Sequence, residues 1–294
     1  MARRSVGEAA FDVANVIFML AFSATIIYPF WDAFLLSFSG PREISGVGFR
    51  LWITHWSMDT YRYIFDRGLI LIAYRNTLFR TVVAVYLTTI TCLFAAYPLS
   101  KRRLPGRTVI TAYFVFSMFF SGGLIPTYLL IRGLGLLNNL WVLVLPQMFN
   151  VFYMIIMRNY LMAAHLEELE EAALVDGGGY PYILFRIMVP LSMPLLATVS
   201  LWVAVAHWNE WFYARIYLTG NRFLVLQYLL QRLIEHHRQD EQILNDYVAQ
   251  TETEINTANV VAGTMILTIG PIVLLYPFLQ KYFVKGVMIG SLKG

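Results

Sequence analysis

A short run of residues between two long apolar stretches has the types and spacing needed to hold a partner protein. It reads Glu171-Ala172-Ala173, then Asp176-Gly177, and ends at Pro190. A glutamate carboxylate makes strong, charge-assisted hydrogen bonds to basic side chains. The alanines leave room for close approach of another chain, and a glycine accepts the positive φ angle of a sharp turn cheaply. This combination favours a docking element for a soluble protein.

The local pattern predicts the elements that position these residues. Apolar residues recur at helical spacing from Met162 to Ala173, and glutamates cover the opposite face, as in a short amphipathic helix. The glycines at 177–179 end this helix, and Pro181 suits the first turn of a second one. Residues 162–190 are therefore expected to form a compact helix–turn–helix projection. A plainer alternative is a surface helix whose acids only keep it in water.

The composition places this projection on a membrane protein. Of the 294 residues, 58% are hydrophobic and 14% are charged, whereas soluble domains carry about 25% charged residues. About 20 apolar residues cross a bilayer as a helix, and lipid leaves unpaired backbone groups without partners. We expect an all-α polytopic membrane protein with one transmembrane domain over residues 1–294. The six predicted spans are 13–38, 77–100, 108–131, 139–159, 191–218 and 258–282.

The basic residues predict the orientation of these spans. The loop 101–107 holds four bases and no acid, and such loops face the cytoplasm. Both termini and the segment 162–190 are then cytoplasmic, in a bacterial inner membrane. The pair Arg3-Arg4 precedes an apolar run that is too long for a signal peptide, so an uncleaved first span is expected.

Two longer segments lie outside on this assignment. Segment 39–76 is rich in aromatic residues, which favours contact with an external partner or anchoring at the membrane interface. Segment 219–257 opens with a turn, continues with leucines at helical spacing from Leu226 to Leu233, and then becomes polar. A loop that meets an external protein and a solvated loop both remain open for it.

The spacing of the docking run resembles a known family. Glu171-Ala172-Ala173, Gly177, nine further residues and Ile187-x-x-Pro190 resemble the E-A-A-x-x-x-G-x9-I-x-L-P loop of ATP-binding-cassette (ABC) importer permeases. Gly178 replaces a common alanine, a change that should not alter the turn. The run Trp208-Asn209-Glu210-Trp211 is similar to the W-N-[DE]-[FW] signature of carbohydrate permeases, and the tail 280–294 to their C-terminus. The resemblance implies a type I ABC importer permease of the carbohydrate uptake class.

That resemblance implies roles for the residues and for the partners. In this family the loop inserts into a cleft of an ATPase subunit, where Glu171 would pair with a basic residue. The tail, with Lys285, Gly286 and Gly290, would lie along the ATPase dimer. The implied partners are a second permease forming a heterodimer, two ATPase subunits, and a solute-binding protein that segment 219–257 would reach. The implied cargo is an oligosaccharide, with alginate favoured and another oligosaccharide as the alternative.

The chain itself is expected to be a non-catalytic subunit without a cofactor. It contains no G-x-x-x-x-G-K-[ST] loop, so ATP and magnesium are expected on the partner ATPases. An intramembrane metalloenzyme would need a motif such as H-E-x-x-H, which does not occur. An ion-coupled secondary transporter is expected to carry internal repeats and intramembrane acids, and Glu210 is the one acid deep in a predicted span. ATP-dependent rather than ion-dependent transport would separate these classes.

Polar and aromatic residues in two predicted spans are candidates for a translocation path. Trp202, Ala206, Asn209 and Tyr213 recur at i, i+4, i+7 and i+11, on one face of a helix. Aromatic rings stack on sugars, and polar residues inside a membrane face the bundle interior. Gln147 and Asn150 are i, i+3 neighbours and are also candidates. Simple packing is an equal alternative, and Glu210, one position off this face, is expected to hold helices together.

Overall fold

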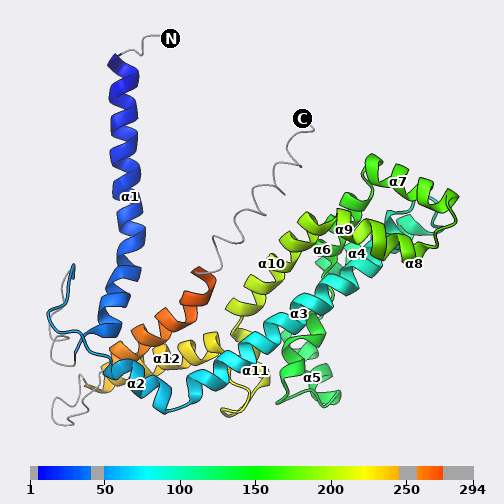
Figure 1. The fold of residues 1–294 in the computed structure, drawn as a ribbon. Helices are drawn as coiled ribbons and strands as arrows, with labels where there is room; N and C mark the ends of the chain where they lie inside the picture. The colour runs from blue at the N-terminus through cyan, green and yellow to red at the C-terminus, as the bar shows by residue number, and fades with distance from the viewer. Residues whose placement is uncertain (1–5, 41–49, 245–256, 274–294) are drawn as a thin grey trace. The chain divides into compact units, whose positions relative to one another are not determined.

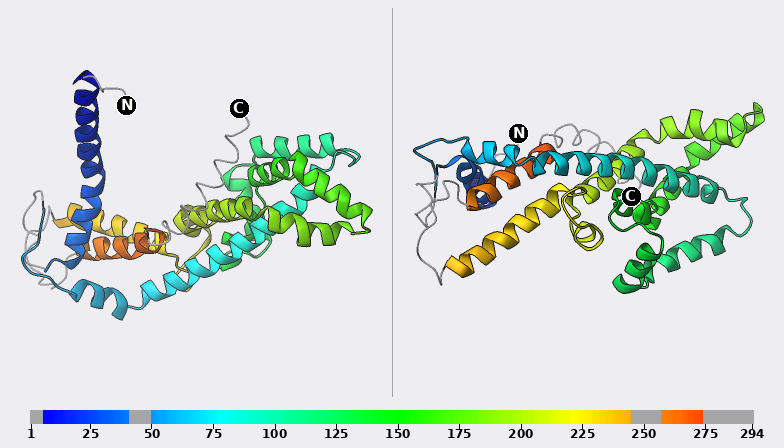
Figure 2. Two further views of the ribbon diagram at one scale, coloured as in Figure 1. Left: turned by 45° about the horizontal axis from the view of Figure 1, so that its top comes forward. Right: turned by 90° about the horizontal axis from the view of Figure 1, so that it is seen from below.

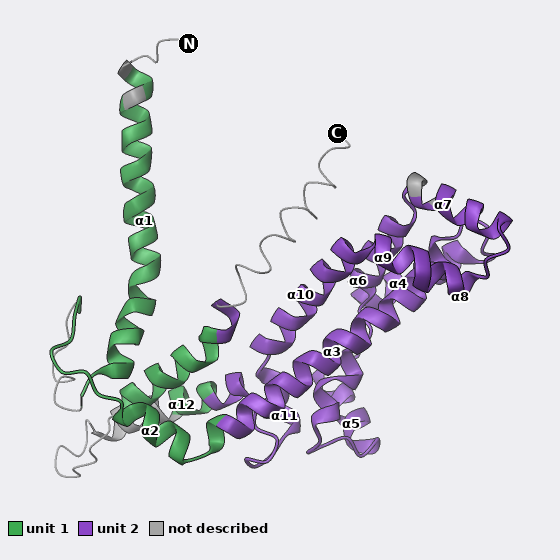
Figure 3. Ribbon diagram, in the orientation of Figure 1, with its two compact units in different colours: residues 1–70, 230–270 green, residues 71–229, 271–294 purple. Residues whose placement is uncertain are grey.

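The computed structural model describes residues 6–40, 50–244 and 257–273, and its named elements are all helices (Figure 1). The chain divides into two compact units, coloured separately in Figure 3. One comprises the residues up to Ile70 together with Leu230–Gly270, and the other contains Leu71–Leu229. The prediction of a single domain over 1–294 is not tested by this division.

The first unit contains α1 (Val6–Phe38), α2 (Asp59–Asp66) and most of a helix at Thr257–Val273. The hydroxyls of Ser37 and Tyr61 lie 2.9 Å apart, and the Asn259 amide donates to the Ser39 carbonyl at 2.7 Å. Aromatic rings at the end of α1 contact the following segment, as in the 5.7 Å pair Phe38 and Trp56. These contacts are compatible with both roles considered for segment 39–76.

The second unit is built on α3 (Leu69–Ser100), which begins before the predicted Thr77. The helices α6 (Val151–Leu161) and α10 (Met193–Asn209) pack against it around a shared apolar core. Figures 1 and 2 show α10 beside α3, where the hydroxyls of Thr89 and Ser200 lie 3.3 Å apart. Fully buried members of this core include Cys92, Met154, Met157, Ile183 and Val199.

Two of the predicted spans are broken rather than straight. In place of a helix over 108–131, α4 (Arg107–Phe119) and α5 (Leu124–Gly133) meet at 107°. Gly123 adopts a φ of +85°, which ends the helical path cheaply. The predicted span 139–159 consists of the 3-10 helices η2 (Leu140–Leu143) and η3 (Leu145–Gln147), followed by α6 at 47°.

The predicted fifth span, 191–218, is interrupted twice. The helix α9 (Val189–Leu191) precedes α10. The helical segment Tyr180–Leu191 and α10 meet at an angle of 79°, next to Pro190 and Pro194. At its other end α10 stops at Asn209, because Glu210 is extended, with φ −76° and ψ 124°. The helices α11 (Phe212–Tyr217) and α12 (Leu226–Leu244) follow.

The number of membrane spans depends on whether each broken pair of helices counts as one span. Two helices are long and apolar enough on their own, Ala10–Phe38 and Leu69–Ser100, and five qualify if each bent pair is one span. The helix Thr257–Val273 is shorter, and the rest of the predicted sixth span lies outside the described residues. The all-α architecture is thus confirmed for the part of the chain described, while the count of six stays a prediction.

Candidate functional site

The docking run forms the helix–turn–helix expected from the sequence. The helix α7 (Ala164–Val175) is followed by α8 (Tyr180–Ile183) and by the π-helical segment η4 (Leu184–Met188). Gly177 adopts a φ of +85°. The Gly178 N–H donates to the Ala173 carbonyl at 2.9 Å, and the Gly177 N–H to the Leu174 carbonyl at 3.1 Å. These two bonds make a Schellman cap, which closes α7 tightly.

Gly178 is less replaceable than the sequence suggested. A Cβ atom built at this position would lie 2.8 Å from the Ala173 carbonyl oxygen, a backbone atom. Real Cβ atoms essentially never approach so closely, so an alanine here would require the cap to shift. The turn expected with glycine at position 178 is present. The Schellman bond itself brings the two groups together.

The predicted docking residues lie mostly on the surface of this projection. Glu171, Ala172 and Asp176 are exposed, Ala173 is half-buried, and Pro190 on α9 is exposed. Val175 is 87% exposed beside them, and Tyr180 is 55% exposed. Single exposed apolar residues are ordinary on protein surfaces, so these exposures are compatible with a surface that a partner covers and with a solvated helix. The tail residues Lys285, Gly286 and Gly290 lie outside the described residues.

A buried acid attaches α7 to the end of α3. Glu170 is nearly fully buried and forms an ion pair with Lys101, which directly follows α3. The Lys101 ammonium also lies 4.1 Å from the centre of the Tyr97 ring. Next to this pair, the Arg158 guanidinium donates to the Leu99 carbonyl at 3.1 Å. Glu170 thus points into the protein, while its neighbour Glu171 points out of it.

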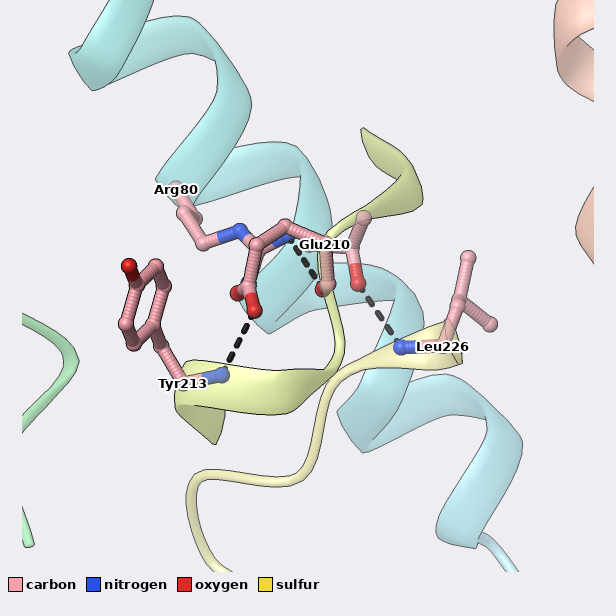
Figure 4. A network of polar contacts seen from close by, with 5 residues as sticks. Arg80, Glu210, Tyr213 and Leu226 are labelled. Carbon is pink, nitrogen blue, oxygen red and sulfur yellow. Dashed lines mark hydrogen bonds and ion pairs between the residues drawn. The ribbon is translucent and has the colours of Figure 1, made fainter. Parts of the chain in front are cut away.

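A second polar network surrounds the end of α10 (Figure 4). Arg80 of α3 donates to the Glu210 carboxylate at 3.1 Å and to the Glu210 carbonyl at 2.8 Å. The other carboxylate oxygen accepts from the Tyr213 N–H at 2.6 Å, and the Thr77 hydroxyl accepts from the Leu226 N–H at 2.9 Å. Glu210 therefore holds helices together, as expected from its place in the sequence.

Arg80 is the residue that sequence reasoning missed. It lies inside a predicted span and is completely buried. A guanidinium in such a place requires a partner. Glu210 was the one acid found deep in a span, so opposite charge made these two residues candidate partners, and the fold decided that they meet.

The path residues predicted from Trp202 to Tyr213 do not all lie on one helix. Trp202 stacks on Tyr153, with ring centres 6.1 Å apart. Asn209 accepts from the Gln227 amide at 3.2 Å. Tyr213 lies on α11, beyond the break at Glu210, and stacks on Tyr217. The prediction of one continuous helical face was therefore wrong, because the helix ends at Asn209.

A cavity of about 230 Å³ lies elsewhere in the second unit, between α3, the segment before α6, and α10. Three of the residues considered for the path line it, namely Gln147, Asn150 and Ala206. Trp202, Asn209 and Tyr213 are not among its lining residues. His207 and Thr88 line it without having been predicted.

The sequence and the structure of this chain were compared with those of known proteins. No family model matches the chain. The Bacillus subtilis (strain 168) protein LplC is 35% identical over 289 residues, which cover 97% of this chain and 95% of LplC. The polygalacturonan/rhamnogalacturonan transport system permease protein YtcP of the same organism is 36% identical over 287 residues, which cover 97% and 98%.

A solved structure has a similar fold to this chain. It is the crystal structure of a bacterial ABC transporter involved in the import of the acidic polysaccharide alginate. One of its chains has a TM-score of 0.85 and 30% sequence identity to this chain, with 96% of this chain and 100% of that chain covered. The relatives are permease subunits of transporters, which implies an integral inner-membrane subunit that is not itself an enzyme. This chain belongs to the family of sugar ABC transporter permeases.

Proposed function

We propose that this chain is one of two membrane subunits of an ATP-driven importer for an acidic oligosaccharide, with alginate fragments favoured. The observation that carries the proposal is the likeness over almost the whole chain to a chain of an importer of the acidic polysaccharide alginate. The polygalacturonan/rhamnogalacturonan system of YtcP makes a pectin-derived oligosaccharide the second candidate.

The projection α7–α8 is the proposed connection to the motor. Its exposed acid Glu171 and exposed apolar Val175 give a partner both a charge and a surface to cover. Two ATPase subunits would carry ATP and magnesium, and a second permease would complete the pathway. Both termini would lie in the cytoplasm, with the tail 285–294 against the ATPases.

The outer face of the membrane is the proposed receiving side. A solute-binding protein outside the membrane would deliver the oligosaccharide there. Segment 219–257, of which α12 forms the part up to Leu244, is the proposed contact with that protein. Deletion of residues 235–250 is expected to reduce uptake, and unchanged uptake would remove this contact from the proposal.

Reconstitution tests the proposal directly. The chain would be assembled with its second permease and two ATPases in liposomes, with the binding protein outside. We expect uptake of an alginate trisaccharide that requires ATP and does not respond to a proton or sodium gradient. Uptake driven by an ion gradient without ATP would overturn the importer class. ATP-driven uptake of an oligogalacturonide but not of the alginate trisaccharide would move the cargo to the second candidate.

A further inference from the structure

We infer that the cavity between α3, η3 and α10 is a binding subsite for one pyranose ring of the cargo, held by this subunit itself. The inference rests on the proposed function, because it assigns part of the sugar contact to this chain. The cavity lies wholly within the second unit and is lined by residues from Thr88 to His207.

The size of the cavity favours a single ring. Its volume is about 230 Å³. Pockets that enclose whole drug-sized ligands measure about 300–1,000 Å³. This cavity is smaller and partly open, so it would hold part of an oligosaccharide and leave the rest outside. One ring of a chain that passes through the protein matches the space.

The polar lining suits hydroxyl groups. Thr88 is 1% exposed, and its hydroxyl has no hydrogen-bond partner among the described residues. The Asn150 side-chain oxygen accepts from the Phe152 and Tyr153 N–H groups, so its amide nitrogen is the atom left for a ligand. Gln147 adds a second carboxamide. A sugar hydroxyl both donates and accepts, so it satisfies groups of this kind together.

The apolar lining suits the carbon face of a sugar. The rings of Phe149 and Tyr153 form part of the wall. Tyr153 is backed by Trp202, with ring centres 6.1 Å apart, and Phe149 by Phe114 at 5.3 Å. Two supported rings keep their orientation, as a stacking surface requires. Trp202 is therefore a positioning residue that supports Tyr153, and not a residue that touches the sugar.

The backbone around the cavity is fixed before any ligand arrives. The Thr91 hydroxyl donates to the Met148 carbonyl, and the Cys92 thiol donates to the Asn150 carbonyl at 3.3 Å. These bonds tie the break between η3 and α6 to α3. Broken helices in membranes expose polar groups where they line a cavity, which is where transporters hold their substrates. The lining includes His207 but has no Asp, Glu, Lys or Arg, so a carboxylate of the sugar would form no ion pair with Lys or Arg in this subsite.

Chemical protection tests occupancy. Gln147→Cys would be introduced in the full complex, and its modification by a small maleimide measured with and without an alginate trisaccharide delivered by the binding protein. The unmodified chain serves as the background, because its one cysteine, Cys92, is fully buried. We expect the trisaccharide to slow modification about fivefold or more, and to leave Arg103→Cys, on the exposed loop before α4, unchanged. Equal rates at position 147 with and without the sugar, in a complex that imports it, would overturn the subsite.

Removal of the buried hydroxyl gives a second test. Thr88→Val deletes a group without a protein partner, so it should not lower the melting temperature, whereas a hydrogen bond to the sugar would be lost. We expect uptake per ATP hydrolysed to fall about three- to tenfold. The control is Thr198→Val, whose hydroxyl bonds the Pro194 carbonyl of its own helix. Unchanged uptake by Thr88→Val would contradict the subsite, whereas failure of the unmodified complex to import any oligosaccharide would contradict the proposed function instead.

Discussion

The helix α3 carries an ion pair near each end, and the two pairs differ in burial and in what they hold. Arg80 and Glu210 have side chains 1% and 18% exposed, and Arg80 also binds the Glu210 carbonyl. Lys101 and Glu170 have side chains 24% and 7% exposed, and they connect α3 to α7. The first pair fixes a break in the backbone, and the second attaches a projection that a partner would move.

This difference predicts different consequences when each pair is lost. A buried pair that loses one partner leaves a charge without compensation in a medium where charges are costly. The cation of the second pair, Lys101, is 24% exposed and is screened by water, whereas Arg80 is 1% exposed, so the second pair contributes less to stability. Loss of the first pair should therefore affect folding, and loss of the second should affect coupling.

Substitution of Arg80 is expected to have the largest effect. Arg80→Met should destabilise the complex by about 3 kcal/mol, because the Glu210 carboxylate loses its charged partner and keeps only the Tyr213 N–H. The measurement is the unfolding midpoint and the yield of assembled complex in detergent. The double variant Arg80→Met/Glu210→Met removes both charges and should recover much of the loss. A double variant as unstable as the single one would show that packing, and not charge, dominates at this site.

Reversal of Glu171 should abolish coupling while folding is preserved. Glu171→Lys places a positive charge where a basic residue of the ATPase is proposed, and a lost charge-assisted bond is worth about 1.5–3 kcal/mol. We expect uptake to fall at least tenfold with an unchanged melting temperature. Glu168→Lys, on the same helix and also exposed, is the matched control. Equal losses in both variants would point to general charge on α7 instead of to a specific docking residue.

The pair at the other end of α3 should have an intermediate effect. Lys101→Glu and Glu170→Lys would each place like charges together, and we expect uptake per ATP to fall about three- to tenfold. The double exchange restores an opposite pair and should recover part of the activity. Arg103→Glu, on the same loop and exposed, controls for the change in charge. Losses that simply add in the double variant would mean that this pair does not link α7 to α3.

The turn that follows α7 should give the smallest effect. Gly177→Ala forces a side chain into a left-handed conformation, which costs about 1–2 kcal/mol. Because the strain is confined to the cap, we expect a modest loss of uptake and a nearly unchanged melting temperature for the whole complex. Gly179→Ala is the control, since φ is −76° there and a Cβ would meet only Pro181, at an ordinary 3.9 Å.

Several elements were predictable because their signals are local. The amphipathic pattern up to Ala173 and the glycines at 177–179 predicted α7 and its cap closely. The break at Glu210 was not predicted, because an apolar run looks continuous to a hydropathy argument. The prediction of one helical face from Trp202 to Tyr213 was wrong for this reason. Helical spacing counted along the sequence does not show that Glu210 is in an extended conformation, which ends the helix.

The sequence by itself determined that this protein is helical, belongs in a membrane and carries a charged, glycine-capped projection. These properties follow from composition, helical periodicity and the φ preference of glycine, each of which acts over a few residues. Only the tertiary structure decided that Arg80 meets Glu210, 130 residues away, and that Gln147, Asn150 and Thr88 surround one cavity. Such contacts depend on how distant helices break and pack, and no local preference specifies that.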